Sequence, residues 1–100
     1  MTTKVTVEER VQAGLAWVIA RYGKDRAMAI DLHKLDLVKS RCCVLGQLEG
    51  DYWEGLRDNH LTLSQAAQLG FQLFQDFEEY QALNATWCAL LRNLDGNEGS

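Results

Sequence analysis

Apolar residues recur at helical spacing along most of the chain, and capping side chains precede several of these runs. In the first run the repeating residues are Val11, Leu15, Val18, Ile19 and Tyr22. Thr6 and Glu9 fit a capping box, in which each side chain accepts a hydrogen bond from the other residue's backbone N–H. The pattern predicts a first helix over residues 7–22 that ends before Gly23.

A second apolar stripe follows Ser40, a residue type that favours the start of a helix. It consists of Val44, Leu45, Leu48, Tyr52 and Leu56. Gly46, Gly50 and Gly55 interrupt this segment, and each weakens a helix by about 1 kcal/mol relative to alanine. A helix with so much glycine usually gains something in return, such as close approach of its backbone to another helix or to a ligand.

Two more capping boxes mark the starts of the last two predicted helices. Thr62–Gln65 precedes a short helix that Gly70 would stop. Asp76–Glu79 precedes a long helix over residues 76–94, closed by Gly96. The apolar stripe of this long helix consists of Phe77, Tyr80, Leu83, Trp87, Leu90, Leu91 and Leu94.

The segment between the first two helices follows neither the helical nor the strand period. We expect a helical turn around Leu32–Leu35 and an extended piece near Asp36–Lys39. The predicted fold is all-α: a small four-helix bundle-like domain with an irregular segment between helices 1 and 2. It would form one domain over residues 1–95, with a flexible tail over 96–100.

Composition and charge narrow the functional classes. The chain has 100 residues, of which 47% are hydrophobic, and no apolar run reaches the roughly 18 residues of a membrane span. Residues 1–50 hold eight Lys/Arg and six Asp/Glu (+2), whereas residues 51–100 hold two and eight (−6). We therefore expect a cytoplasmic protein without a membrane or nucleic-acid partner, whose acidic half suits a basic protein or simple solubility.

Residues 61–71, "LTLSQAAQLGF", resemble the opening of an excisionase-type or MerR-type helix-turn-helix. A recognition helix must contact bases and phosphates, yet residues 61–91 contain no Lys or Arg. A weak transcription regulator is therefore one alternative. The simpler interpretation assigns to the core Leu63, Ala66, Ala67, Leu69 and Phe71.

The candidate catalytic groups are few. Cys42 and Cys43 fall near a predicted helix N-terminus, which would lower the pKa of a thiol, and His33 or His60 could act as a base. No family signature surrounds these cysteines, and Cys43 is expected to face the core. The three cysteines and two histidines of the chain lack metal-ligand spacing. We expect no enzyme activity, no cofactor and no metal.

The pair Asp31 and Asp36 in "DLHKLDL" is expected to cap short loops rather than to form a catalytic or metal-binding pair.

Four residues are the better candidates for binding: Gln47, Tyr52, Trp53 and Trp17. Tyr52 lies on the apolar stripe and is expected in the core, whereas Trp53 lies about 100° away on a helix and is expected to be partly exposed. An exposed tryptophan beside glycines is a common anchor in protein interfaces. Trp17 is similarly displaced from the main stripe of the first helix.

Residues 30–56, "IDLHKLDLVKSRCCVLGQLEGDYWEGL", resemble small proteins of actinobacterial phages. The "CVLGQL" core is the most specific part, and Leu69-Gly70-Phe71 with Tyr80, Leu83 and Trp87 extends the likeness. Glu49 departs from that pattern, which has an aromatic or aliphatic residue there. The resemblance implies a phage or prophage origin and a host-cytosol setting, and it brings no activity.

The leading hypothesis is a non-catalytic phage accessory protein that binds a host or defence protein. The second is a small-molecule binder, such as a sponge for a nucleotide signal, that uses Gln47, Tyr52, Trp53 and backbone amides. A regulator built on residues 61–91 and a minor structural or assembly component are the remaining alternatives. The sequence leaves homo-oligomerisation open.

Overall fold

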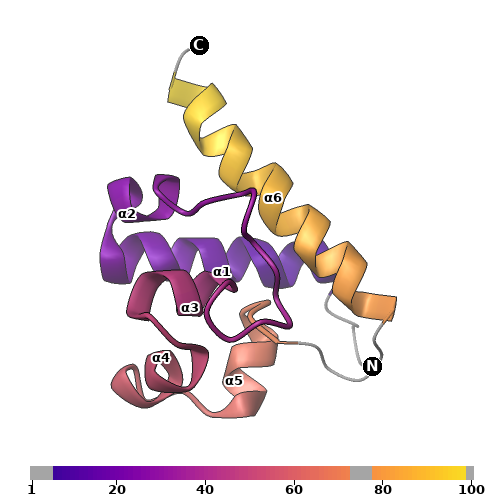
Figure 1. Ribbon diagram of the computed structural model, residues 1–100. Coiled ribbons are helices and arrows are strands. Elements are labelled where there is room, and N and C mark those ends of the chain that lie inside the picture. Colours follow the sequence, from indigo (N-terminus) through magenta and orange to yellow (C-terminus); the bar gives the residue numbers. More distant parts are fainter. Residues whose placement is uncertain (1–5, 73–77, 99–100) are drawn as a thin grey trace.

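Six α-helices form the chain in its computed structural model, which describes residues 6–72 and 78–98 (Figure 1). They are α1 (Val7–Tyr22), α2 (Lys24–Met28), α3 (Val44–Glu49), α4 (Tyr52–Asp58), α5 (Leu63–Gln68) and α6 (Glu78–Glu98). The described ranges contain no strand, so the predicted all-α class is confirmed. Six helices replace the predicted four, because one predicted helix is divided and α2 was not anticipated.

The helix α1 forms as its sequence pattern predicts. The Thr6 hydroxyl accepts a hydrogen bond from the Glu9 N–H, and the Glu9 carboxylate accepts one from the Thr6 N–H, both at 3.0 Å. This capping box satisfies two of the N–H groups that a helix start leaves without intrahelical partners. Gly23 ends the helix with φ 97°, a backbone conformation that glycine adopts without a steric penalty.

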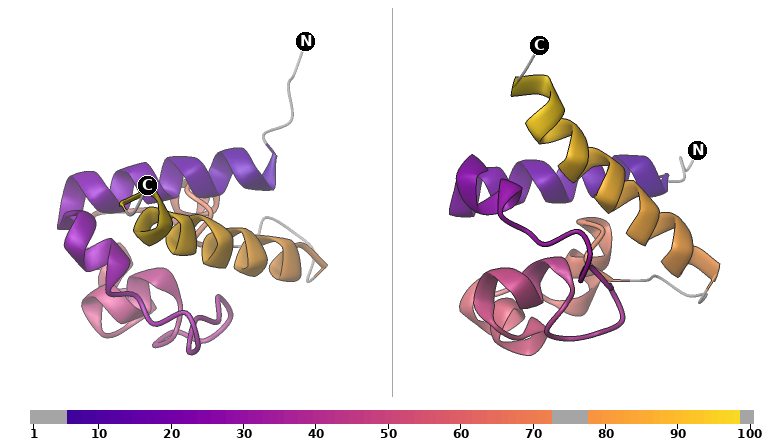
Figure 2. Two further views of the ribbon diagram at one scale, coloured as in Figure 1. Left: turned by 90° about the horizontal axis from the view of Figure 1, so that it is seen from above. Right: turned by 45° about the horizontal axis from the view of Figure 1, so that its top comes forward.

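The helices α1 and α6 cross obliquely and pack against each other, and α3, α4 and α5 gather beneath this pair (Figures 1 and 2). Trp87 of α6 is fully buried at the centre. Its ring stacks on Phe71 with centroids 5.6 Å apart, and its indole N–H donates to the Gly70 carbonyl at 2.7 Å. The largest aromatic side chain of the core is therefore both packed and hydrogen-bonded.

Arg10 is the buried charged residue of the described ranges, with 2% of its surface exposed. Its guanidinium donates to the carbonyls of Ala67 and Gln72 and to the Glu79 carboxylate, each at 2.8 Å. We call these four residues the arginine junction. It joins α1, the end of α5 and the start of α6. A buried charge without partners is strongly destabilising, and here three acceptors surround the guanidinium.

Gly14 lets α1 approach the chain that follows α5. A Cβ atom at this position would lie 1.9 Å from the Leu69 carbonyl oxygen and 2.9 Å from the Trp87 ring. Those separations are below van der Waals contact, so no larger residue fits without moving backbone.

The second apolar stripe belongs to two helices rather than one. Gly50, in the left-handed region with φ 93°, ends α3, and the Asp51 side chain caps α4 by accepting from the Trp53 N–H at 3.0 Å. The cap of α3 is Cys43, whose Sγ accepts from the Gly46 N–H at 3.2 Å, so the expected cap at Ser40 is wrong. The residues of the stripe are nevertheless all buried.

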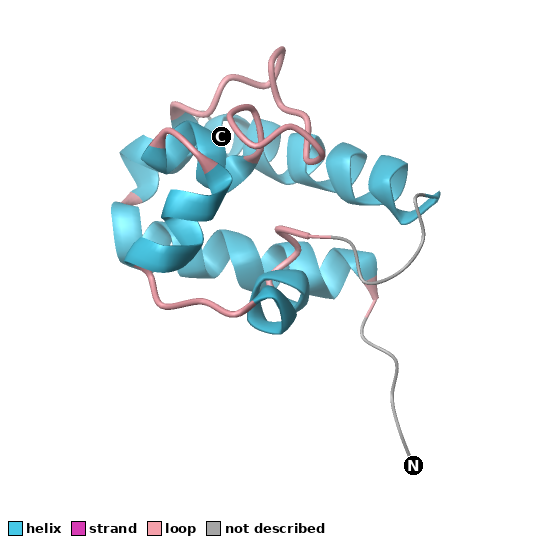
Figure 3. Cartoon of the chain, turned by 60° about the horizontal axis from the view of Figure 1, so that its bottom comes forward, coloured by secondary structure: helices cyan, strands magenta, loops and turns pink. Residues whose placement is uncertain are grey.

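The connection between α2 and α3 runs alongside α6 and forms turns for much of its length (Figure 3). The predicted turn around Leu32–Leu35 is present at residues 32–34. The expected extended piece at Asp36–Lys39 is wrong, because the Lys39 N–H donates to the Asp36 carbonyl at 3.1 Å and closes a turn. The Asp36 carboxylate also accepts from the Val38 N–H at 3.2 Å, which confirms its capping role.

The capping box at Thr62 is confirmed, and α5 ends at Gln68, two residues before Gly70. The third predicted box, at Asp76–Glu79, begins outside the described residues. The helix α6 continues past Gly96 to Glu98, so it includes the first part of the predicted tail. The radius of gyration, 12.8 Å, is close to the ~13 Å expected for a compact chain of this length.

Candidate functional site

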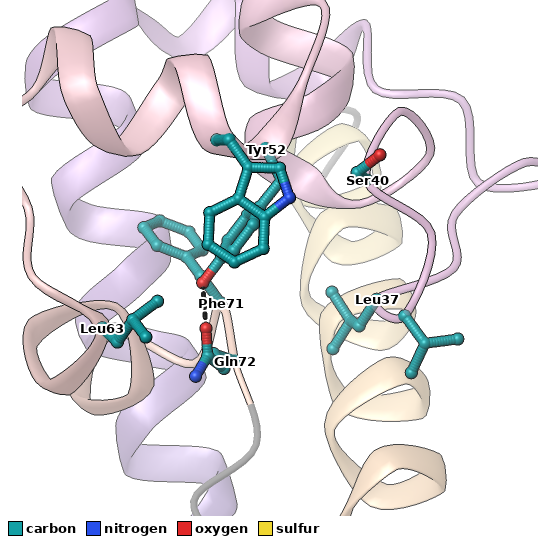
Figure 4. A pocket seen from close by; sticks show the side chains of 8 residues that line it. Leu37, Ser40, Tyr52, Leu63, Phe71 and Gln72 are labelled. Atoms are coloured by element: carbon teal, nitrogen blue, oxygen red, sulfur yellow. Dashed lines mark hydrogen bonds between the residues drawn. The ribbon is translucent and has the colours of Figure 1, made fainter.

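A groove of about 420 Å³ opens between α4, α5 and the loop that precedes α3 (Figure 4). We call this site the groove, and its lining residues are Leu37, Val38, Ser40, Tyr52, Trp53, Leu63, Phe71 and Gln72. Leu37 and Leu63 stand on opposite sides, with Tyr52 and Phe71 between them (Figure 4). The lining contains no charged side chain, which makes the groove an apolar site with a few neutral polar groups.

The rim of the groove holds every large hydrophobic residue that the described ranges expose. Val38 is 51% exposed, Trp53 59% and Leu63 47%. They come from the loop before α3, from α4 and from α5, so only the tertiary fold brings them together. Single exposed apolar residues are ordinary on protein surfaces, but a cluster around one concavity is typical of a binding site.

The floor of the groove is buried and hydrogen-bonded. Tyr52 and Phe71 are almost inaccessible to solvent, and the Tyr52 hydroxyl donates to the Gln72 side-chain oxygen. Burial raises the pKa of the Tyr52 hydroxyl, so it remains a neutral donor near neutral pH. The Trp53 ring meets the Tyr52 ring edge-on with centroids 5.1 Å apart, which supports the exposed indole from beneath.

One wall of the groove is the loop segment Leu37, Val38 and Ser40, which we call the loop wall. Asn84 of α6 holds its start with both ends of one amide: the oxygen accepts from the Leu37 N–H at 3.1 Å, and the nitrogen donates to the Leu35 carbonyl at 3.3 Å. At the other end the Ser40 carbonyl accepts from the Tyr52 N–H at 2.7 Å. The wall is therefore held through its backbone from two sides.

Tyr80 of α6 adds a further tie to this loop. Its hydroxyl donates to the Asp36 carboxylate at 2.8 Å, and that hydrogen bond to a charged acceptor raises the pKa of the Tyr80 hydroxyl. The same carboxylate oxygen caps the Val38 N–H. Asp36 is thus a structural residue of the wall.

The structure brings two of the four predicted binding residues together at the groove. Trp53 lies on the rim and Tyr52 on the floor, as their positions on the helix predicted. Trp17 lies elsewhere: it is half-buried and packs edge-on against Phe71 and Tyr22, with centroids 5.5 and 6.0 Å apart. Its contacts are those of a residue at the margin of the core.

Gln47 lies outside the groove, and its amide is occupied by the chain itself. Its oxygen accepts from the Asp31 N–H at 2.7 Å, and its nitrogen donates to the carbonyls of Asp31 and Cys42 at 3.1 and 3.0 Å. These three bonds tie the irregular loop to α3. The Gln47 amide, predicted as a binding group, thus forms structural hydrogen bonds between the loop and α3.

The glycines of residues 46–55 serve packing and chain reversal. A Cβ atom at Gly46 would lie 2.2 Å from the Ser40 carbonyl oxygen, and one at Gly55 would lie 3.1 Å from the Leu45 side chain. Gly50 supplies the left-handed end of α3. Of the two explanations for a glycine-rich helix, close approach of protein segments is the one that these contacts support.

The environment of Cys43 is that of a buried small residue. Burial raises the pKa of its thiol from 9.0 to about 11, against the lowering contribution of its hydrogen bond from the Gly46 N–H. The lower thiol pKa expected from the helix N-terminus is therefore wrong for Cys43. Within residues 6–72 and 78–98, no three His, Cys, Asp or Glu side chains are grouped as metal ligands.

The second helix of a helix-turn-helix starts three or four residues after the first. Here α5 ends at Gln68 and residues 69–72 are turn and bend, so the positions where such a helix would start lie outside the described residues. Ala66, Ala67 and Phe71 are buried as predicted, but the expectation that Leu63 lies in the core is wrong, because it is exposed on the rim.

Sequence reasoning missed Val38, Leu63 and Gln72 as groove residues. Leu63 follows a helix cap, and Val38 lies in a segment without periodicity, so no local pattern distinguishes either from a core residue. The only usable signal is weak: Leu63 is an apolar residue in the first turn of a six-residue helix whose buried face is formed by alanines.

Comparison with protein-family models, with curated proteins and with solved structures finds no match to this chain. No helix in the described ranges is both long and apolar enough to cross a membrane.

Proposed function

We propose that this chain is a non-catalytic binding protein that takes an apolar segment of a partner protein into the groove. The observation that carries the proposal is the convergence of Val38, Trp53 and Leu63 on one concavity. These are the large apolar side chains that the described part of the chain leaves in water. Their association with a partner would remove that surface from solvent, which is the main driving force of protein association.

The groove is suited to this role because its floor is preorganised. Tyr52 and Phe71 are fixed by packing and by the Tyr52–Gln72 hydrogen bond, so binding need not order them. Trp53 supplies a large exposed ring of the type that dominates binding energy in protein interfaces.

The partner that we propose is a host or phage protein in a bacterial cytoplasm. This setting rests on the resemblance of residues 30–56 to small proteins of actinobacterial phages. A protein that acts by occupying a segment of a host or defence protein needs no catalytic group, and the groove lining offers none.

A small apolar molecule is the second candidate occupant. The volume of about 420 Å³ falls within the range of roughly 300–1,000 Å³ typical of ligand pockets. A nucleotide is a poorer fit, because Lys39 and Arg41 lie outside the groove lining and the Gln47 amide is used elsewhere.

The test is capture of a partner from actinobacterial host lysate, followed by titration of the purified partner against variants. Trp53→Ala and Leu63→Ala are expected to weaken binding at least about tenfold, because each removes a central apolar contact. Gln12→Ala, at an exposed position of α1, is the matched control and should bind like the parent protein.

A partner that binds both groove variants as tightly as the parent protein would refute the proposal. A thermal-shift screen covers the second candidate: stabilisation by an apolar compound that depends on Trp53, without any groove-dependent protein partner, would favour the small-molecule function instead.

A further inference from the structure

We propose that the partner segment is an amphipathic helix whose flank carries acidic residues that face Lys39 and Arg41. This inference rests on the proposed function and specifies the chemistry of the occupant. It follows from two observations: the backbone N–H groups of Leu37, Val38 and Lys39 are already in use, and two exposed cations, Lys39 and Arg41, are adjacent in sequence to residues of the loop wall.

The loop wall does not offer a strand edge to an extended peptide. The N–H of Leu37 donates to Asn84, that of Val38 to the Asp36 carboxylate, and that of Lys39 to the Asp36 carbonyl. Recognition by strand addition requires free N–H and C=O groups along an extended edge. The other walls, α4 and α5, are helices and use their backbone groups internally.

A partner must therefore satisfy its own backbone hydrogen bonds and present side chains, which is the property of a helix. The groove offers apolar contacts from three separate elements, at Val38, Trp53 and Leu63. A helix with apolar residues at i, i+3 or i+4 and i+7 presents such a stripe, and this mode of recognition is common for grooves lined by apolar side chains.

The charged residues near the groove determine which charge the partner helix should carry on its flank. Lys39, between two residues of the loop wall, has 69% of its side chain exposed, and Arg41, next to Ser40, is also exposed. Among described carboxylates, Asp36 is the one within ion-pair distance of Lys39, at 3.9 Å, and it already accepts hydrogen bonds from Tyr80 and Val38.

The opposite side of the groove differs in charge. The sequence of α5, Leu63–Gln68, contains no charged residue, and α4 carries Glu54 beside Trp53. Lys39 and Arg41, which are adjacent in sequence to residues of the loop wall, thus form a basic flank on a chain of net charge −4. A helix with Asp or Glu on the side that meets Lys39 and Arg41 is electrostatically complementary, whereas a basic helix is repelled there.

The experiment is selection from a displayed library of randomised peptides of about 15 residues, the length at which an isolated helix becomes marginally stable. The full chain, its Trp53→Ala and Leu63→Ala variants, and the double variant Lys39→Glu/Arg41→Glu serve as separate baits. Lys34→Glu/Arg57→Glu, at two exposed cations outside the groove lining, is the matched control for net charge.

The expected result is enrichment of peptides with an apolar i, i+3/i+4, i+7 pattern and flanking Asp or Glu. The double reversal at 39 and 41 should weaken a selected peptide about tenfold at low salt, with a smaller loss at high salt, and the matched control should not. Selection on the reversed bait should enrich Lys or Arg in the same flank.

Other results overturn the inference. Proline-rich or extended peptides, or helical peptides without acidic bias whose affinity is unchanged by the double reversal, would contradict it while leaving the groove as a binding site. If no enriched peptide depends on Trp53 or Leu63, the proposed function itself fails with these peptides, and the two failures are thus distinguished.

Discussion

The arginine junction and the groove both depart from the usual rule that charged side chains are solvated and large apolar side chains are buried. In the junction a cation, Arg10, is buried, and in the groove three large apolar side chains are in water. The junction is complete, because every bond it makes has a partner within the chain. The groove is incomplete, because nothing in the described chain covers its rim. The first arrangement stabilises the fold, and the second is the apolar surface that we propose a partner covers.

Gln72 belongs to both regions. Its carbonyl accepts from the Arg10 guanidinium, and its side-chain oxygen accepts from the Tyr52 hydroxyl in the groove floor. The arginine junction therefore holds one end of the groove in place. The contrast between the two predicts that substitutions in the junction act on stability and those on the rim act on binding.

The largest effect is expected from Arg10→Ala. This change removes the buried guanidinium that donates to the Ala67 and Gln72 carbonyls and to the Glu79 carboxylate, at a cost of about 3–5 kcal/mol in the free energy of unfolding. Urea unfolding measures it, with Arg21→Ala as the control, because Arg21 is exposed and its side chain donates a hydrogen bond to Asn59 on the surface. If Arg10→Ala lowers the free energy of unfolding no more than Arg21→Ala does, the arginine junction does not stabilise the fold in this way.

The next effect is the dependence of stability on alkaline pH. The folded state holds the Cys43 thiol pKa near 11 against 9.0 for the free group, so the unfolded chain loses its proton first as pH rises. The stabilising contribution is complete below pH 9 and falls by about 2–3 kcal/mol as pH rises through 11.

Unfolding curves across this pH range test the effect, with Cys43→Ala expected to show a shallower decline. Cys42→Ala, at the adjacent half-buried thiol, should retain the slope of the parent protein. Tyr52, whose pKa is also raised by burial, contributes in the same direction and remains in both variants. Parallel declines in the Cys43→Ala and parent proteins would show that this thiol is not the cause.

A smaller effect is expected from Gly14→Ala. The added Cβ meets the Leu69 carbonyl oxygen, so the substitution should destabilise by about 1–3 kcal/mol even though alanine favours helix. The neighbouring exposed change Ala13→Gly should cost only about 0.5–1 kcal/mol through helix propensity. Thermal unfolding of the two variants measures both, and a gain of stability in Gly14→Ala would contradict the close packing of α1 on the chain after α5.

The smallest effect on stability is expected on the rim. Trp53→Ala and Leu63→Ala should change the free energy of unfolding by no more than about 1 kcal/mol, because about half of each side chain is exposed and Trp53 loses only its edge-on contact with Tyr52. The same unfolding assay measures this, with Leu56→Ala as the buried counterpart on α4, expected to cost about 2–5 kcal/mol. A rim variant that unfolds as easily as Leu56→Ala would show that the rim belongs to the core.

The helices with strong local signals were predictable. The bounds of α1 follow from its capping box, its apolar repeat and Gly23, and the start of α5 follows from the box at Thr62. The division between α3 and α4 was readable in principle, since a glycine followed by Asp51 combines a helix end with a helix cap. The short α2 has only five residues and shows no periodicity.

The groove was predictable only through residues whose burial follows helix geometry. The exposure of Trp53 and the burial of Tyr52 follow from their adjacent positions on one helix. The exposure of Leu63 and the contacts of Gln47 depend on which distant segments meet them, and local pattern carries no information about that. Arg10 was missed for the same reason, because a charged residue in a first helical turn is usually solvated.

The amide of Asn84 acts on the loop before α3 as a neighbouring strand would, by pairing with the N–H of one residue and the carbonyl of another. Both hydrogen bonds are made to backbone atoms of the loop, so they do not depend on which side chains the loop carries. The path of the loop at Leu35 and Leu37 is therefore set by the side chain of a distant helix and not by the side chains of the loop itself. A substitution at Asn84 would consequently move the loop wall without changing any residue that lines the groove.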